Sequence, residues 1–285
     1  MAAAAPVGDP VTDLEPIAVR RHGSRGRTVV VLHGGPGAPG SAAGLARALA
    51  DDFVVLEPLQ RRSGRVPLTV ARHVEDLAAV APSPAVLVGH SWGAMLALSF
   101  ASRQPERVSE LVLVGCGTYD HAARAELQRS LARRQTEADR ARIEALRASL
   151  AAERDPAARD AIFGAIGSAT MRAESYELVD DPGDAADPVA PVPADEKGHL
   201  ETWSDVLRLQ AEGVEPAAFR AITARVLMLH GDVDPHPGPA TRDLLRRFIP
   251  RLEYVGLERC GHEPWRERYA RSPFLAALRR WLAAA

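Results

Sequence analysis

The sequence is poor in residues that mark several classes of protein. Its 285 residues include only two cysteines, Cys116 and Cys260, and their wide separation argues against a disulfide framework and against a zinc site built on cysteine. Lys197 is the only lysine, and 35 basic against 37 acidic residues leave no excess of either charge. This balance gives no reason to expect a nucleic-acid partner.

Long apolar runs are also missing. No stretch approaches the roughly 18–20 apolar residues of a membrane span. The first sixteen residues are interrupted by Asp9 and Asp13, and they lack the basic start and the apolar run of a signal peptide. We therefore expect a soluble cytoplasmic protein without a membrane span. A hydrophobic content of 46% over this length is enough for a sizeable core.

The first part of the chain alternates two kinds of apolar segment. Runs such as TVVVL and AVLVG are short and nearly continuous, as in strands that are buried on both faces of a parallel sheet. The segments between them have the periodicity of amphipathic helices. We expect strands at 16–23, 28–35, 53–58, 85–91 and 110–117, and helices at 41–52 (with Ser41 as its cap), 68–80 and 92–104.

The alternation stops at Thr118 and resumes near residue 225. Residues 121–154 are rich in Ala, Arg, Glu and Leu, which predicts one or two helices with charged outer faces. Residues 180–198 are rich in Pro and Asp and predict a loop, and residues 199–213 predict another helix. The interruption therefore contains helices and loops but no predicted strand.

After the interruption, two further strand–helix pairs complete the chain. The sequence thus predicts one α/β core, formed by residues 1–117 and 223–285, with a mostly parallel sheet and helices on both faces. A mainly helical insertion, residues 118–222, interrupts this core. Insertions after the carboxyl ends of strands commonly cover a site, so we expect a cap.

Ser91 lies where a predicted strand becomes a predicted helix, in Gly89-His90-Ser91-Trp92-Gly93. Such a sharp turn strains the backbone of its central residue and leaves no room for side chains two residues away, which accounts for both glycines. It also holds the serine hydroxyl at the edge of the sheet, beside the free N–H groups of the helix start. Ser91 is the candidate nucleophile; the alternative is that it only caps the helix.

A serine nucleophile needs a base, and the chain has nine histidines. His262 follows the last predicted strand in a loop with glycine and proline, from which it can reach the edge of the sheet. His90 is expected to point away from the site, and His33 and His230 to brace loops where strands end. Surface or packing positions are expected for His22, His73, His121 and His199. His262 is therefore the candidate base.

Two aspartates, Asp232 and Asp234, follow the predicted strand RVLMLHG. Either could accept a hydrogen bond from Nδ1 of His262, which would fix the histidine tautomer and stabilise the imidazolium. We favour Asp234, because it lies farther from the strand end and leads into a proline-rich turn. Asp232 is then expected to bond the turn backbone. Asp120, after an earlier strand, is a third candidate.

An oxyanion hole needs two N–H donors near the serine. The first donor is expected to be the backbone N–H of Trp92, the residue after the nucleophile. The second is expected in the loop His33-Gly34-Gly35-Pro36-Gly37, whose glycines let the backbone approach a substrate oxygen closely. We assign it to Gly35, with Gly34 as the fallback and His33, Pro36 and Gly37 as supporting residues.

These segments together resemble the α/β-hydrolase superfamily, and within it most closely the branch of proline iminopeptidases and related small esterases. In that family the triad follows the order serine, aspartate or glutamate, histidine, which falls on Ser91, Asp234 and His262. The resemblance covers about residues 16–117 and 222–284. Its motifs are HGGPG at 33–37, GHSWG at 89–93, PERVSELVLVG at 105–115, GDVD at 231–234 and GHEPW at 261–265.

One segment departs from the family pattern. The family usually has a strand ending in aspartate followed by Gln-Arg-Gly-x-Gly-x-Ser, and this chain has Glu57-Pro-Leu-Gln-Arg-Arg-Ser63 instead. An aminopeptidase of this branch also needs carboxylates that bind the free amine of its substrate. Glu174, Glu177 and Glu201 are available in the insertion, but their spacing does not mark them for this task.

The expected activity is that of a serine hydrolase without metal or other cofactor, acting on a small ester, lactone or amide through an acyl-enzyme. Three alternatives remain open: an N-terminal-proline aminopeptidase, an acyltransferase, and a ligand-binding protein on the same fold. The expected partner is a small-molecule substrate, and the sequence does not indicate an oligomeric state.

Overall fold

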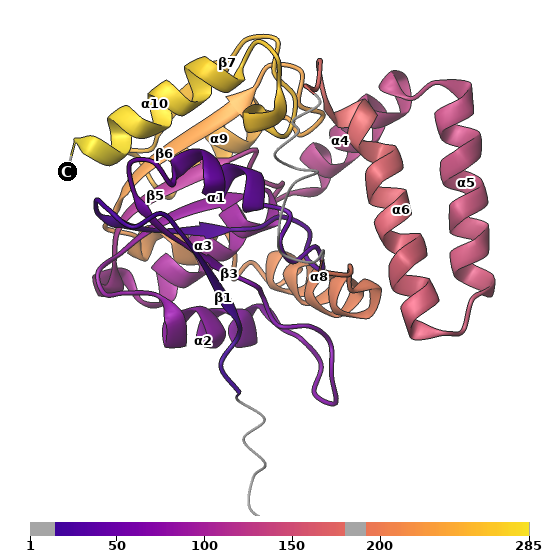
Figure 1. The fold of residues 1–285 in the computed structure, drawn as a ribbon, viewed down its shortest axis with the longest axis horizontal. Helices are drawn as coiled ribbons and strands as arrows, with labels where there is room; N and C mark the ends of the chain where they lie inside the picture. Colours follow the sequence, from indigo (N-terminus) through magenta and orange to yellow (C-terminus); the bar gives the residue numbers. More distant parts are fainter. Residues whose placement is uncertain (1–14, 180–191, 285) are drawn as a thin grey trace, which may run out of the picture.

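The core of the molecule is a seven-stranded sheet with the strand order β1-β3-β2-β4-β5-β6-β7 (Figure 1). The computed structural model describes residues 15–179 and 192–284. β1 pairs antiparallel with β3, and all other neighbouring strands are parallel. The mostly parallel sheet predicted from the sequence is therefore confirmed. The strands are β1 (Val19–His22), β2 (Thr28–Leu32), β3 (Val54–Pro58), β4 (Ala85–His90), β5 (Val108–Val114), β6 (Arg225–Gly231) and β7 (Glu253–Leu257).

Helices cover both faces of this sheet, as the continuous apolar strands require. Alternate residues of β2 point to opposite faces, so Val30 packs with one cluster and Val31 with the other. The Val30 cluster includes α2 (Val70–Val80), α3 (Trp92–Arg103) and α9 (Gly238–Arg246); the Val31 cluster includes α1 (Ala43–Leu49) and α10 (Arg271–Ala283). The cap expected for α1 is wrong: its N-cap residue is Ala42, not Ser41.

The described part of residues 118–222 is mainly helical, and it holds one isolated β-bridge, Leu178 with Glu267. α5 and α6 run side by side and project from the body of the molecule (Figure 1). The helices are α4 (His121–Arg134), α5 (Glu137–Ala152), α6 (Pro156–Glu174) and α8 (Glu196–Ala211), followed by the 3-10 turn η2 (Ala217–Ala221).

The sequence missed α6 and misplaced the start of α8. α6 carries Gly164 and Gly167 and has two buried residues, Ala169 and Ala173, so it lacks a clear apolar stripe. α8 begins at Glu196, inside the segment predicted to be a loop, because Asp195 caps it by accepting from the Gly198 N–H. The rest of that loop, residues 180–191, lies outside the described residues.

Two buried carboxylates join this helical segment to the core. Glu267 accepts the backbone N–H groups of Tyr176 and Glu177 at 2.7 Å, and that of Gly261 at 2.9 Å. Asp195 accepts the backbone N–H and the hydroxyl of Ser63. Both joints lie in segments that follow the carboxyl ends of strands, where open α/β sheets bind their ligands.

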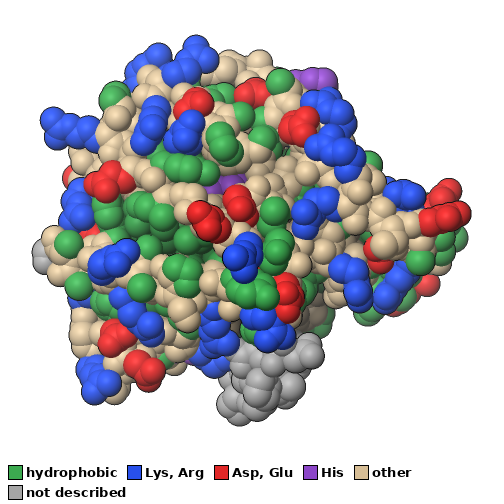
Figure 2. Space-filling view, turned by 90° about the horizontal axis from the view of Figure 1, so that it is seen from above, with side chains coloured by type: hydrophobic (Ala, Val, Ile, Leu, Met, Phe, Trp, Pro, Cys, Tyr) green, Lys and Arg blue, Asp and Glu red, His purple; other side chains and the backbone are tan. Residues whose placement is uncertain are grey.

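None of the helices in the described part of the chain is long and apolar enough to cross a membrane. On the face shown in Figure 2, acidic and basic side chains are interspersed, with hydrophobic side chains between them. Cys116 and Cys260 are both buried and free, as the sequence suggested.

Candidate active site

Ser91 occupies a strained turn between β4 and α3. Its backbone has φ 53° and ψ −117°, a region that non-glycine residues rarely adopt. A Cβ on Gly93 would lie 2.4 Å from the backbone oxygen of Leu32, and a Cβ on Gly89 would lie 2.3 Å from that of Gly93. Both glycines are therefore required by close backbone packing, and this packing holds Ser91 at the carboxyl end of the central strand.

Asp234 and His262 meet at the same edge of the sheet, after β6 and β7. Nδ1 of His262 lies 2.8 Å from Oδ2 of Asp234, and the Asp234 side chain is fully buried. Asp232 instead accepts from the backbone N–H of Cys260, and Asp120 caps α4 by accepting from the Ala123 N–H. Of the three aspartates considered from the sequence, Asp234 is the one paired with His262.

The two partners hold each other in opposite charge states. Burial favours the neutral form of Asp234, but the neighbouring histidines outweigh it and keep the pKa of this carboxyl well below its ordinary value. Burial likewise lowers the pKa of His262, but the Asp234 carboxylate outweighs it and raises the pKa to about 9. Asp234 therefore stays ionised and stabilises an imidazolium at His262.

A second histidine, His236, occupies the other oxygen of the same carboxylate. Its Nδ1 and its backbone N–H each lie 2.9 Å from Oδ1 of Asp234, and its ring stacks on that of His262 with the centroids 4.3 Å apart. This residue was not predicted from the sequence. The available signal was its position two residues after Asp234, from which a side chain can fold back onto the carboxylate.

His90 does not point away from the site, contrary to the expectation. Its ring packs 4.7 Å from that of His262, and its Nε2 lies 3.0 Å from the His262 backbone oxygen. Burial keeps the pKa of His90 well below its ordinary value, so the neutral ring donates from Nε2. His262 is thus held between the rings of His90 and His236.

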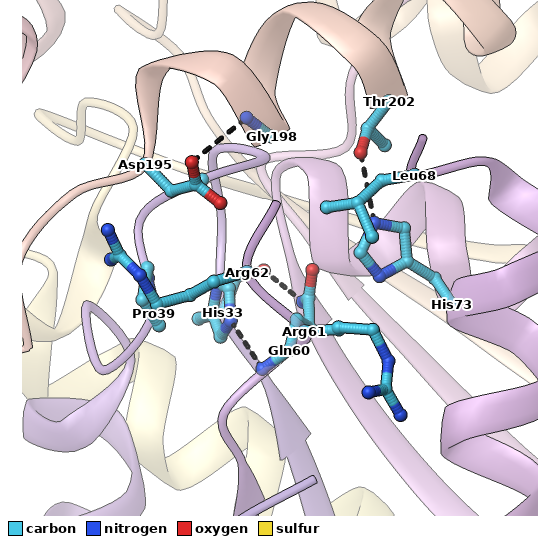
Figure 3. Close-up of a pocket in the computed structure, with 11 residues that line it drawn as sticks. His33, Pro39, Gln60, Arg61, Arg62, Leu68, His73, Asp195, Gly198 and Thr202 are labelled. Carbon is cyan, nitrogen blue, oxygen red and sulfur yellow. Dashed lines mark hydrogen bonds between the residues drawn. The ribbon is translucent and has the colours of Figure 1, made fainter. Parts of the chain in front are cut away.

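The two loops expected to form the oxyanion hole are linked through Gln60. The indole N–H of Trp92 donates to Oε1 of Gln60 at 2.7 Å. Nε2 of Gln60 donates in turn to the His33 backbone oxygen at 3.2 Å (Figure 3). Burial lowers the pKa of His33 to about 4, so its ring is neutral. Nε2 of this ring accepts from the backbone N–H of Gln60, and Nδ1 donates to the backbone oxygen of Gly34. Gln60 belongs to the segment that departs from the family pattern.

The other residues of the glycine loop are packed against the helical segment. Gly35 has φ 113° and Gly37 has φ 83°, conformations that favour glycine. A Cβ on Gly37 would lie 2.4 Å from the backbone oxygen of Asp195, and the Pro36 oxygen accepts from the ring of His199 at 2.9 Å. His199, which was expected to be a surface or packing residue, therefore lies beside the site.

Two cavities open beside Ser91, and both are lined by Ser91, Gly35 and His236. The larger has a volume of about 440 Å³ and is also lined by His262, by Phe163 and other residues of α6, and by Glu174 and Glu263. The smaller has a volume of about 150 Å³ and is lined by residues of α3, α4 and α8, including Met95, Leu127 and Trp203. The structure therefore brings Ser91, His262 and Gly35 to one cavity.

The glutamates considered from the sequence lie in different places. Glu174 lines the larger cavity, together with Glu263, whose pKa is raised by burial despite its ion pair with Arg266. Glu177 is paired with Arg268 near the surface, and Glu201 accepts from the Leu68 N–H. Only Glu174 of the original three is therefore placed to contact a substrate.

One group of side chains in the described ranges, 15–179 and 192–284, offers metal-ligand atoms close together. These are Asp234, His236 and His262, with atoms within 4.8 Å of one another. The Nδ1 atoms of both histidines already face the carboxylate oxygens. The arrangement is that of a hydrogen-bonded acid–base cluster, so we assign no metal to it.

Comparison with known proteins finds a relative that aligns with part of this chain. A cis-3-alkyl-4-alkyloxetan-2-one decarboxylase from Shewanella oneidensis is 30% identical over 108 residues, which cover 33% of this chain and 34% of that protein. The match thus spans about a third of that relative's length.

Two solved structures show how far the fold is shared. A thermophilic esterase from Thermogutta terrifontis is 21% identical with a TM-score of 0.52, covering 94% of this chain and 93% of that one. Est816, an N-acyl homoserine lactone degrading enzyme, is 21% identical with a TM-score of 0.54, covering 93% and 96%. At these identities the likeness establishes the fold.

The family itself is shown by the sequence. Residues 29–272 match the alpha/beta hydrolase family, and this range includes Ser91, Asp234 and His262. The seven-stranded sheet and its helices have the corresponding fold. The chain therefore belongs to the alpha/beta hydrolase family.

Proposed function

We propose that this protein is a serine hydrolase that cleaves small esters, lactones or amides through an acyl-enzyme. One observation carries the proposal. Ser91 and His262 line one cavity, and the buried Asp234 is hydrogen-bonded to Nδ1 of His262. The three residues follow the ends of three strands, β4, β6 and β7. In such an arrangement a histidine can accept a proton from a serine while an aspartate stabilises the resulting imidazolium.

Each residue then has a defined role. Ser91 attacks the carbonyl carbon, and His262 takes its proton and passes it to the leaving group. The N–H groups of Gly35 and Trp92 stabilise the negative oxygen of the tetrahedral intermediate. Water, activated by His262, releases the acyl group. His236 and Gln60 support the reacting groups by holding Asp234 and the oxyanion loops in place.

The related proteins and the position of the helical segment support this proposal. One relative is named for an oxetan-2-one, which is a lactone, and the two structures are an esterase and a lactone-degrading enzyme. All three names involve an ester-type carbonyl. Residues of α6 and α8 line the cavity beside Ser91, so residues 118–222 would act as a cap that shapes the substrate site.

A second candidate function is the N-terminal-proline aminopeptidase suggested by the sequence motifs. Glu174 and Glu263 favour it, because both line the larger cavity and carboxylates can bind a substrate ammonium. Such an enzyme would require a free α-amine, whereas an esterase would not.

Parallel assays separate the two functions. Three proteins are assayed: the wild type, Ser91→Ala and the control Ser41→Ala, which changes another serine that lines the same cavity. The substrates are p-nitrophenyl butanoate, a lactone, proline p-nitroanilide and its N-blocked form. We expect ester or lactone cleavage by the wild type and Ser41→Ala. Ser91→Ala should lose about 10³-fold or more in kcat. Cleavage of free but not blocked proline anilide would establish the aminopeptidase, and full activity of Ser91→Ala would refute both.

A further inference from the structure

The two cavities beside Ser91 differ in one respect that bears on the substrate. His262 lines the larger cavity and does not line the smaller one. In the proposed reaction His262 must deliver a proton to the leaving atom, so the leaving group has to lie on its side of Ser91. The larger cavity then holds the leaving group, and the acyl substituent extends into the smaller cavity.

The volume of the smaller cavity limits the acyl group. It offers about 150 Å³, against about 440 Å³ in the larger cavity. The acyl group is therefore the part of the substrate that is more restricted in size, and a short acyl chain fits this space better than a long one. Leu127, on α4, and Trp203, on α8, form part of its wall.

One wall of the smaller cavity carries a positive charge. Arg124, on α4, lines it and donates to Oε1 of Gln210, whose amide nitrogen donates in turn to the Thr118 backbone oxygen at 3.1 Å. Among the residues that the structure describes, no carboxylate is in ion-pair contact with Arg124. The guanidinium is thus held in position by neutral partners and keeps its charge available to a ligand.

We propose that the acyl group of the substrate is short and ends in a carboxylate bound by Arg124, so that the substrate is a monoester of a short dicarboxylic acid. A planar guanidinium matches the geometry of a carboxylate and binds it more strongly than it binds a neutral oxygen. The inference rests on the proposed function of Ser91. It also places Glu174 and Glu263 on the leaving-group side, away from the acyl end that an aminopeptidase would read.

The reaction balances for a benzyl monoester of succinic acid. The Ser91 oxygen bonds to the carbonyl carbon, the bond to the benzyl oxygen breaks, and the serine proton passes through His262 to give benzyl alcohol. Water then adds to the succinyl-enzyme, gives one proton to His262, and the serine oxygen leaves and regains that proton. The products are succinate and benzyl alcohol, and no oxidant or co-reactant is consumed.

The test compares two esters of equal acyl size, benzyl hydrogen succinate and benzyl 4-methylpentanoate. They differ by a carboxylate in place of an isopropyl group. The wild type is expected to show a kcat/KM ratio that favours the succinate by about tenfold or more, and Arg124→Gln should remove this preference through a higher KM for the succinate. Arg129→Gln, on the same helix but exposed and paired with Glu126, should keep the wild-type ratio.

A chain-length series tests the size limit. Benzyl octanoate should be cleaved at least about tenfold less efficiently than benzyl butanoate, and Leu127→Ala should narrow that difference by enlarging the cavity. The inference is overturned if the wild type prefers the neutral ester, if Arg124→Gln keeps the preference, or if octanoate is the better substrate. If Ser91→Ala cleaves these esters at the wild-type rate, the proposed function itself fails. If cleavage depends on Ser91 but the succinate ester is not preferred, only the proposed binding of the acyl carboxylate by Arg124 is refuted.

Discussion

Asp234 is the residue on which the electrostatics of the site depend. Three histidines surround its buried side chain: His262 and His230 approach Oδ2 at 2.8 and 3.3 Å, and His236 approaches Oδ1 at 2.9 Å. Burial lowers the pKa of His230, so the neutral ring donates from Nε2, which lies 3.0 Å from the His236 oxygen. The carboxylate therefore has a fixed orientation before substrate binds, and its charge acts mainly on His262.

This arrangement predicts a shift of the pH profile in Asp234→Asn. His262 must be neutral to accept the serine proton, so kcat/KM of the wild type should rise with pH through its raised pKa, near 9. Without the carboxylate, burial is left as the main influence and lowers the pKa, so the rising limb should move to lower pH. The maximum rate should also fall, by about 10⁴-fold if this site behaves like other triads.

A pH–rate profile of both proteins on one ester measures this shift. His90 and His236 also face His262, and the ring of His236 is hydrogen-bonded to the same Asp234 carboxylate. If the rising limb of the pH–rate profile lies at the same pH in both proteins, Asp234 does not control the protonation of His262.

The side chain of Glu267 joins the helical segment to the core. Glu267, which is fully buried, accepts three backbone N–H groups, and one of them belongs to Gly261, directly before His262. The backbone N–H of His262 donates in turn to the backbone carbonyl oxygen of Glu174 at 2.8 Å. The end of α6 and the His262 loop are thus one hydrogen-bonded unit, so the position of His262, the proposed base, depends on the helical segment.

Glu267→Gln should weaken this unit. The amide nitrogen of glutamine cannot accept a hydrogen bond, so at least one buried N–H loses its partner, at a cost of about 1–3 kcal/mol in the free energy of unfolding. Glu177→Gln, in the exposed pair with Arg268, should change stability by no more than about 0.5 kcal/mol. Urea unfolding of the wild type and both variants measures these changes, provided that the m-value stays the same. If Glu267→Gln unfolds at the same urea concentration as the wild type, Glu267 does not secure the loop.

At the level of the whole molecule, the sequence predicted those features that depend on neighbours along the chain. The strands and the positions of Ser91, Asp234 and His262 could be predicted because each of these residues follows an apolar strand. Gln60 and His236 could not, because their roles arise from contacts with Trp92 and with the stacked ring of His262. α6 was missed because its small residues give it no apolar stripe.

The substrate could not be predicted from the sequence, because the site is built from segments that are far apart in the chain. The walls of both cavities combine residues of the core with α4, α6 and α8, and the placement of these helices is set by joints such as those of Glu267 and Asp195. The proposed hydrolytic activity depends on one residue that lines both cavities, Ser91, whose hydroxyl has to be activated.

Covalent labelling with a fluorophosphonate tests that activation most directly, because an activated serine oxygen displaces fluoride from phosphorus and forms a stable adduct. Intact mass followed by peptide mapping should find one adduct, on Ser91, in the wild type and in Ser41→Ala, and none in Ser91→Ala. A wild type that remains unlabelled, or equal labelling of Ser91→Ala, would contradict the account.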